Sequence, residues 1–264
     1  MTEFTPNSIL KTEKLSIGYR NRNSETYIAQ DININISPGQ LVAVIGINGI
    51  GKSTLLRSLS GVQENLSGNI LIDEKDLKSL PPLEQASLIS LVLTGQPVSK
   101  NLSVFELVAL GRQPYTNWIG RLTKNDLRHI KKSLRLVDIE SLENKKCYEL
   151  SDGQMQKVLI ARALAQDTPL VILDEPTTHL DLYHKAYILQ LLKKLTRKTN
   201  KAIIFASHEI NLALQLCDKI LLMQKNEIVM GSPQELIRSG KLSSIFPSDL
   251  IFFDKNSSSF KIKS

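Results

Sequence analysis

The segment that most constrains the fold is residues 46–53, a glycine-rich turn with the spacing G-x-x-x-x-G-K-S. The apolar run Leu41–Ile45 before it is expected to be a buried strand, and residues 55–59 after it are expected to belong to a helix. In that strand–loop–helix context the glycines let the backbone curl, so that successive N–H groups point inward at an anion. The alternative is a tight turn without a ligand. The segment predicts an α/β fold with a mostly parallel central sheet and a phosphate-binding loop.

The candidate nucleotide-binding residues of this loop are Gly46, Asn48, Gly49, Gly51, Lys52, Ser53 and Thr54. Lys52 carries a compact positive charge that can reach the β- and γ-phosphates, and Ser53 can ligate Mg²⁺. The helix that starts near Gly51 adds its positive dipole end to the same anion.

The composition suits one large α/β domain, or one domain with an inserted lobe, because 42% of the 264 residues are hydrophobic. The net charge of +7 is scattered, and its small clusters, such as Lys131-Lys132, are interpreted as solvated surface. Since no basic stripe interleaved with aromatics is evident, no nucleic-acid partner is expected. Cys147 and Cys217 lack metal-like spacing and are expected to be reduced thiols.

The first residues lack the features of a signal peptide, and no apolar run approaches the ~20 residues of a spanning helix. Any role at a membrane is therefore expected to need a partner.

The first third of the chain is predicted to be rich in strands that form an N-terminal antiparallel β subdomain. Strands are expected at residues 9–17, 31–37 and 68–73, with a polar turn over residues 20–25. A helical subdomain is expected to be inserted over about residues 97–165. Its helices are predicted at residues 104–110, 126–137 and 154–165, the second capped by Thr123 or Asp126.

The rest of the chain alternates between strands and a helix, as right-handed β-α-β units do. The strands are predicted at Leu170–Leu173 and Ala202–Ala206, with a helix at residues 183–196 between them. The main domain is expected to span residues 1–238. A short tail, residues 239–264, is expected to carry a small hairpin from residues 251–253 and 260–262.

Two acids, Asp174 and Glu175, follow the apolar strand directly. In an open parallel sheet, ligands gather beyond the carboxyl ends of the strands. Asp174 is placed to hold Mg²⁺, and Glu175 is placed to orient or polarise an attacking water. With a phosphate loop upstream, the pair is interpreted as catalytic rather than as the start of a surface loop.

A third motif, residues 150–154 with the sequence Leu-Ser-Asp-Gly-Gln, precedes the predicted helix 154–165. A serine and a glycine at a helix start offer free N–H groups to an anion. The same residues also suit an ordinary helix cap, which physical reasoning alone favours.

The order of these motifs, followed by a lone histidine, resembles the ATP-binding cassette family of transport ATPases over nearly the whole chain, to about residue 235. The resemblance implies ATP and Mg²⁺ as ligands and ATP hydrolysis as the activity. It also implies a homodimer in which Ser151, Asp152, Gly153 and Gln154 face the nucleotide of the partner subunit. Lys52, Glu175 and His208 then serve hydrolysis, with Ser53 and Asp174 on the metal.

The resemblance gives roles to two further residues. Tyr19 matches the aromatic residue that stacks on adenine, although a core or surface tyrosine fits its spacing equally well. Asp181 matches an aspartate that lies across the dimer interface.

Two positions depart from the family pattern. Asp152 stands where the signature has its first glycine; we expect its side chain to point away from γ-phosphate and to help cap the following helix. The family also places a metal-contacting glutamine after the strand that precedes the helical lobe. Gln96 fills this position only if the loop is shifted by two residues, and otherwise Thr94 does.

Residues 106–115 resemble the helical lobe of importers of iron–siderophore, haem and cobalamin. This resemblance implies polytopic membrane permease subunits as partners, a substrate-binding protein as an indirect one, and a peripheral location at the cytoplasmic face of the membrane. Arg112, Tyr115 and Trp118 are expected as anchors beside the groove where permease subunits dock, unless Trp118 packs within the lobe. The rival classes are a soluble cassette ATPase that drives assembly, for example of iron–sulfur clusters, and a small-molecule kinase.

Overall fold

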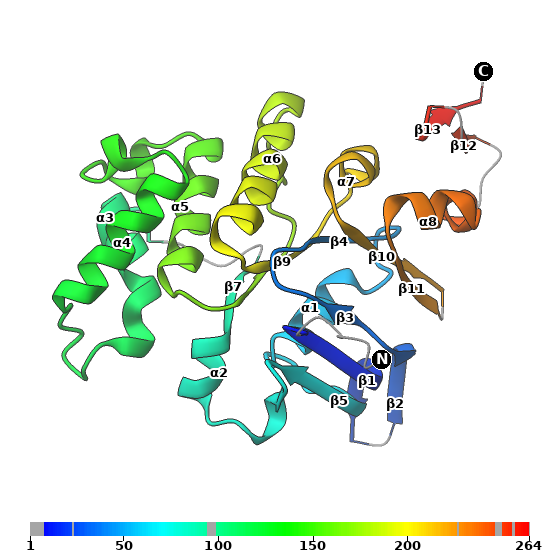
Figure 1. Cartoon of the computed structure of the whole chain (residues 1–264), viewed down its shortest axis with the longest axis horizontal. Helices are drawn as coiled ribbons and strands as arrows, with labels where there is room; N and C mark the ends of the chain where they lie inside the picture. Colours follow the sequence, from blue (N-terminus) through cyan, green and yellow to red (C-terminus); the bar gives the residue numbers. More distant parts are fainter. Residues whose placement is uncertain are drawn as a thin grey trace, which may run out of the picture.

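The computed structural model describes residues 8–22, 24–93, 99–225, 227–245, 250–254 and 257–263. Its strands form two sheets and a terminal hairpin (Figure 1). The first sheet is antiparallel and has the order β2 (Ser24–Ile32), β1 (Leu10–Asn21), β5 (Ser67–Ile72) and β6 (Lys75–Asp76), with β3 (Asn35–Ile36) also paired to β1.

The second sheet carries the phosphate loop. Its order is β11 (Glu227–Gly231), β10 (Lys219–Gln224), β4 (Leu41–Ile45), β9 (Ala202–Ala206), β8 (Leu170–Leu173) and β7 (Ile89–Val92). All neighbours in this sheet are parallel except β10 and β11. A mixed, mostly parallel sheet beside an antiparallel N-terminal sheet confirms the predicted fold class.

The helices divide between the sheets and a separate lobe. The lobe, at the left of Figure 1, contains α3 (Val104–Ala109), α4 (Lys124–Leu136) and α5 (Asp152–Ala165). The others are α1 (Lys52–Leu59), α2 (Pro82–Leu88), α6 (Leu182–Thr199), α7 (Ile210–Leu216) and α8 (Pro233–Arg238). Short 3₁₀ turns lie at η1 (Leu77–Ser79), η2 (Leu110–Tyr115), η3 (Glu140–Leu142), η4 (Cys147–Glu149) and η5 (Lys241–Ser244).

The central strand β4 explains how the two cores form. Because side chains alternate along a strand, Leu41, Ala43 and Ile45 pack with the helices of the larger core. Val42 and Val44 point to the opposite face, where α1 and the antiparallel sheet complete a second core. A strand buried on both faces needs apolar residues at every position, which is why this segment is continuously hydrophobic.

Most predicted elements are present, and the terminal hairpin is confirmed as β12 (Ile251–Asp254) and β13 (Ser259–Ile262). The turn expected at residues 20–25 is shorter than predicted, because β1 continues to Asn21 and β2 begins at Ser24. The expected strand 31–37 is also interrupted: Asp31 has a φ of 52°, and the hydroxyl of Thr12 bonds Ile32 O and Ile34 N in place of a regular ladder. Helix α2 was not predicted.

Helix α4 begins after Thr123, whose hydroxyl accepts from the Asp126 N–H, while the Asp126 carboxylate accepts from the Thr123 N–H. Thr123 is therefore the cap, and Asp126 completes the reciprocal capping box. Among the described residues, no helix is long and apolar enough to cross a bilayer.

Candidate nucleotide site

Three adjacent parallel strands deliver the candidate residues to one edge of the central sheet. Strand β4 leads into the phosphate loop, β8 leads into Asp174 and Glu175, and β9 leads through Ser207 to His208. Because β4, β9 and β8 are neighbours and parallel, their carboxyl ends meet at the same edge. Residues more than a hundred positions apart in the sequence therefore come together.

Two glycines of the loop, Gly46 and Gly51, occupy positions where a side chain does not fit. A Cβ on Gly46 would lie 2.6 Å from the carbonyl oxygen of Met223. Gly51 has a φ of 110°, and a Cβ there would lie 2.3 Å from the Ile28 side chain. Gly51 is also the residue just before α1, so this conformation aims the first N–H groups of the helix into the loop.

Lys52 is buried at the centre of this loop. Its Nζ donates to the carbonyl oxygens of Gly46 and Ile47, at 3.0 and 3.2 Å. Burial lowers the pKa of Lys52, an effect that the carboxylates of Glu175 and Asp174 oppose. A buried ammonium that donates its hydrogen bonds to neutral carbonyls is a ready partner for an anion.

The two acids after β8 have different partners. Ser53 Oγ donates to Asp174 Oδ1 at 3.1 Å, which places a hydroxyl and a carboxylate oxygen side by side. Glu175 has a φ of 50°, and its Oε1 lies 2.6 Å from His208 Nε2. Thr178 Oγ1 donates to the other oxygen of Glu175 at 3.1 Å. Sequence reasoning missed Thr178, because only the turn after Glu175 brings it back.

Tyr19 lies at the open side of the same site. Its hydroxyl is 3.0 Å from Thr54 Oγ1, and half of its surface is exposed. Tyr19 is thus a surface aromatic beside the loop, not a core residue, and its exposed ring is free to stack on a base.

These residues enclose one cavity of about 380 Å³. Its lining consists of Tyr19, Asn48, Gly49, Gly51, Lys52, Ser53, Thr54, Glu175 and His208. The structure thus brings together the phosphate loop, the tyrosine, the acid after β8 and the histidine after β9. The cavity combines N–H donors and an ammonium on one side with a carboxylate–imidazole pair on the other, as phosphoryl transfer requires.

The Leu-Ser-Asp-Gly-Gln residues, 150–154, lie outside the lining of this cavity. Ser151, Gly153 and Gln154 line a second cavity of about 270 Å³ with residues of α5 and α6, and none of them lines the first. Ser151 caps α5 by accepting from the Gln154 N–H at 3.3 Å. The expectation that Asp152 helps to cap the helix is therefore corrected: Asp152 is the first helical residue, where its charge favours the helix dipole.

Asp181 likewise serves the local structure, since its Oδ1 accepts from the His184 N–H at 2.8 Å and caps α6. Gln96 and Thr94 lie outside the described residues. The two cysteines are free and buried.

A third recess, of about 440 Å³, is lined by Leu83 of α2, Leu91 of β7 and residues of the helical lobe. The lobe residues are Leu110, Gly111, Gln113 and Pro114 of η2, with Arg162, Ala163 and Gln166 from the end of α5. The backbone of Gly111 lies close to that of Arg162, so a Cβ on Gly111 would lie 2.2 Å from the Arg162 carbonyl oxygen.

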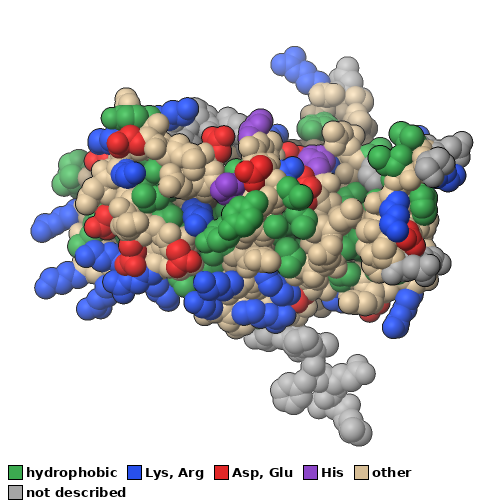
Figure 2. Space-filling view, turned by 90° about the horizontal axis from the view of Figure 1, so that it is seen from above, with side chains coloured by type: hydrophobic (Ala, Val, Ile, Leu, Met, Phe, Trp, Pro, Cys, Tyr) green, Lys and Arg blue, Asp and Glu red, His purple; other side chains and the backbone are tan. Residues whose placement is uncertain are grey.

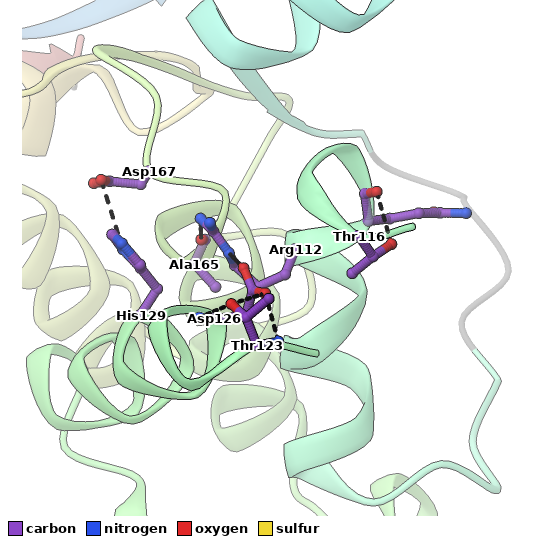
Figure 3. Close-up of polar contacts among 8 residues, drawn as sticks. Arg112, Thr116, Thr123, Asp126, His129, Ala165 and Asp167 are labelled. Atoms are coloured by element: carbon purple, nitrogen blue, oxygen red, sulfur yellow. Dashed lines mark hydrogen bonds and ion pairs between the residues drawn. The ribbon is translucent and has the colours of Figure 1, made fainter. Parts of the chain in front are cut away.

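Arg112 is only 4% exposed, so its expected role as an anchor for permease docking is wrong. Its Nε donates to Asp126 Oδ1 at 2.9 Å, and its Nη1 donates to Ala165 O at 2.7 Å (Figure 3). The Tyr115 ring lies 4.0 Å from the guanidinium carbon. Burial opposes the charged carboxylate of Asp126, but hydrogen bonds from Thr123 and Arg112 outweigh it and lower its pKa.

Comparison with known proteins identifies the class to which this fold and site belong. The family model described as ABC transporter matches residues 29–178. The chain is 34% identical to the probable siderophore transport system ATP-binding protein YusV of Bacillus subtilis, over 90% of this chain and 86% of that protein. The chain belongs to the ABC transporter family and is one of its ATPases.

Solved structures agree with this assignment. One is described as "An inward-facing conformation of a putative metal-chelate type ABC transporter"; it shares a TM-score of 0.77 and 30% identity, over 91% of this chain and 89% of that one. Another is the dimeric cassette MJ0796 in a post-hydrolysis state bound to ADP and Pi, with a TM-score of 0.71 and 27% identity, over 85% of this chain and 98% of that one.

Proposed function

We propose that this chain is the ATP-hydrolysing, nucleotide-binding subunit of a membrane importer for iron–siderophore or related metal chelates. The observation that carries the proposal is the identity to a siderophore transport ATP-binding protein along nearly the full length of both chains. The likeness to a metal-chelate type transporter points the same way. Haem and cobalamin, which residues 106–115 also suggest, stay as alternative substrates of the importer.

The residues present fit Mg²⁺ together with a nucleotide. Within the described part of the chain, no cluster of His, Cys, Asp or Glu side chains is large enough to hold a metal alone. Mg²⁺ usually takes one or two protein oxygens, phosphate oxygens and water, and Ser53 Oγ beside Asp174 Oδ1 offers such a pair. When bound, the ion would neutralise charge on the β- and γ-phosphates.

In the proposed mechanism, each side chain acts from the place described above. Lys52 exchanges its bonds to the Gly46 and Ile47 carbonyls for phosphate oxygens, and the loop N–H groups hold the same phosphates. Glu175 orients the attacking water and accepts its proton. His208, bonded to Glu175, orients that carboxylate and contacts the γ-phosphate.

We propose a homodimer because the signature residues and the phosphate loop line different cavities of one chain. A second copy would place Ser151, Asp152, Gly153 and Gln154 over the nucleotide, with Asp181 at the interface. The dimeric state of the MJ0796 cassette supports the dimer. The cassette spans residues 1–238 with the helical subdomain at about 97–165, and residues 239–264 form a tail. It is peripheral at the cytoplasmic face of the membrane, and a substrate-binding protein acts upstream.

Lys52→Ala is expected to abolish the stabilisation that ATP gives to the folded protein. A ligand at a hundred times its Kd stabilises by about 2.7 kcal/mol, and this shift depends on the buried ammonium. Thermal melts with and without ATP measure it. Lys75→Ala, an exposed lysine of β6, is the matched control and should melt as the wild type does. An ATP-induced shift that is equal in Lys52→Ala and the wild type would contradict the phosphate-loop assignment.

Leu110→Glu is expected to uncouple transport while isolated ATPase activity stays near that of the wild type. Leu110 is about half exposed on the wall of the recess beside Gln113 and Pro114, where we propose that a permease segment docks. A buried carboxylate there would weaken docking. The measurement is co-purification with a co-expressed polytopic permease, and Val62→Glu is the control for an exposed apolar residue elsewhere.

This experiment also tests the rival class. If the chain co-purifies only with soluble proteins and neither variant alters membrane capture, the transport function is wrong and an assembly ATPase is favoured.

A further inference from the structure

The outward face of α4 is a continuous basic stripe. Its members are Lys124, Arg128, Lys131, Lys132 and Arg135. With 3.6 residues per turn, these positions stack along one face, opposite the buried Asp126, Ile130, Ser133 and Leu134. Lys and Arg side chains gather at the lower left of Figure 2, the side on which the helical lobe lies in Figure 1. The lysine pair at 131–132, interpreted from sequence as scattered charge, is part of this organised surface.

The stripe is largely without compensating acids. Arg135 pairs with Glu140 at 2.7 Å, at the carboxyl-terminal end of the helix. Lys124, Arg128, Lys131 and Lys132 have no ion-pair partner among the residues that the structure describes. Asp126, the acid within the helix, faces inward to Arg112.

Two exposed apolar residues, Trp118 and Ile119, lie in the turn just before this helix, and we call them the apex. Trp118 is 94% exposed and Ile119 is 69% exposed, so the alternative that Trp118 packs within the lobe is wrong. A hydrogen-bonded turn holds them: Gly120 N donates to Asn117 O at 2.8 Å, and Arg121 N donates to Asn117 Oδ1 at 3.0 Å. An exposed tryptophan beside an exposed aliphatic residue suits a partner that offers an apolar layer next to a polar one.

In the sequence, Trp118 and Ile119 follow closely on the residues that line the recess proposed for the permease. Gln113 and Pro114 line that recess, and Trp118 comes four positions after Pro114. If the permease docks there, the apex and the start of α4 lie on the side of the molecule that faces the membrane. This step rests on the proposed function.

We propose that residues 117–121 and the basic face of α4 form a lipid-contacting surface, which binds anionic headgroups and inserts Trp118 and Ile119 at the interface. Tryptophan is favoured at membrane–water interfaces, and clustered Lys and Arg are attracted to anionic lipid. Nucleic acid fits less well, because the aromatic residue stands at one end of the stripe and is not interleaved with the bases.

The test uses the purified full chain without permease or nucleotide, and Trp118 is its own reporter because it is the only tryptophan. We expect a blue shift of its emission, and pelleting of the protein, with vesicles of phosphatidylcholine mixed with phosphatidylglycerol. Vesicles of phosphatidylcholine alone should give neither, and high salt should reverse the effect. Each basic residue near an anionic surface contributes about 5-fold to partitioning, so R128Q/K131Q/K132Q should weaken binding roughly 100-fold.

The control variant K14Q/K75Q/K78Q removes the same charge from exposed lysines of the antiparallel sheet and of η1. It should bind almost as the wild type does, and Trp118→Ser should pellet less. Equal loss in both triple variants, or no blue shift with anionic vesicles, would overturn the proposal. So would binding of a single-stranded oligonucleotide without binding of vesicles. ATPase activity and permease capture, measured separately, report on the proposed function. The lipid-contact proposal and the proposed function can therefore fail independently.

Discussion

Glu175→Gln is expected to leave ATP binding intact and to lower steady-state turnover by about 10²–10⁴-fold, the usual loss when a catalytic base or water-positioning group is removed. Glu175 is suited to that role because its carboxylate lies in the nucleotide cavity next to His208 and one residue after Asp174. Glutamine keeps the shape and accepts no proton. Phosphate release under saturating ATP is the measurement.

Binding and hydrolysis can be separated in the same variant. Because the phosphate loop is untouched, the ATP-induced thermal shift of Glu175→Gln should equal that of the wild type. Size-exclusion chromatography with ATP should show a longer-lived dimer. Thr178→Val removes one hydrogen bond to Glu175 and should cause a smaller loss. Normal hydrolysis by Glu175→Gln would refute the role given to this acid.

Asp126→Asn is expected to destabilise the fold by about 3–5 kcal/mol, because removing one partner of a buried ion pair leaves the other charge uncompensated. Arg112 is buried against Asp126, and Thr123 N and Oγ1 also donate to the same carboxylate. The free energy of unfolding from chemical denaturation measures the effect. Glu140→Gln, which breaks the exposed Arg135 pair, is the matched control and should cost less than about 1 kcal/mol.

The pH dependence should follow the same pair. The pKa of Asp126 is lower in the folded state than in the unfolded state. The stability that its carboxylate gives the fold is therefore fully present above the unfolded pKa and is lost as the pH falls through the folded pKa. Asp126→Asn should lose that part of the acid sensitivity. The double variant Arg112→Met/Asp126→Leu removes both charges and should cost less than Asp126→Asn alone. Equal stability of Asp126→Asn and the wild type would show that the ion pair is not needed.

The sequence was sufficient to predict the local fold and the site residues wherever a motif determines its own backbone conformation. The phosphate loop has glycines at positions 46 and 51, where a side chain would collide, so the motif predicts its own backbone conformation. The same holds for the apolar strands β8 and β9, whose ends carry Asp174, Glu175 and His208. The right-handed rule for β-α-β units predicts a parallel sheet with these residues at the carboxyl ends of its strands, whereas the strand order comes from the structure.

Tertiary structure decided which side chains face inward and which meet. Periodicity marks the apolar face of a helix, yet Arg112 is buried because Asp126 and Ala165 O, which come from separate segments, accept its hydrogen bonds. Tyr115, from the same 3₁₀ turn as Arg112, covers the guanidinium. Trp118 is exposed because a local turn lifts it away from the lobe. The bend at Asp31 depends on Thr12, which lies in another strand. The burial of Arg112 and the bend at Asp31 depend on residues from other segments, whose positions are fixed only when the chain packs.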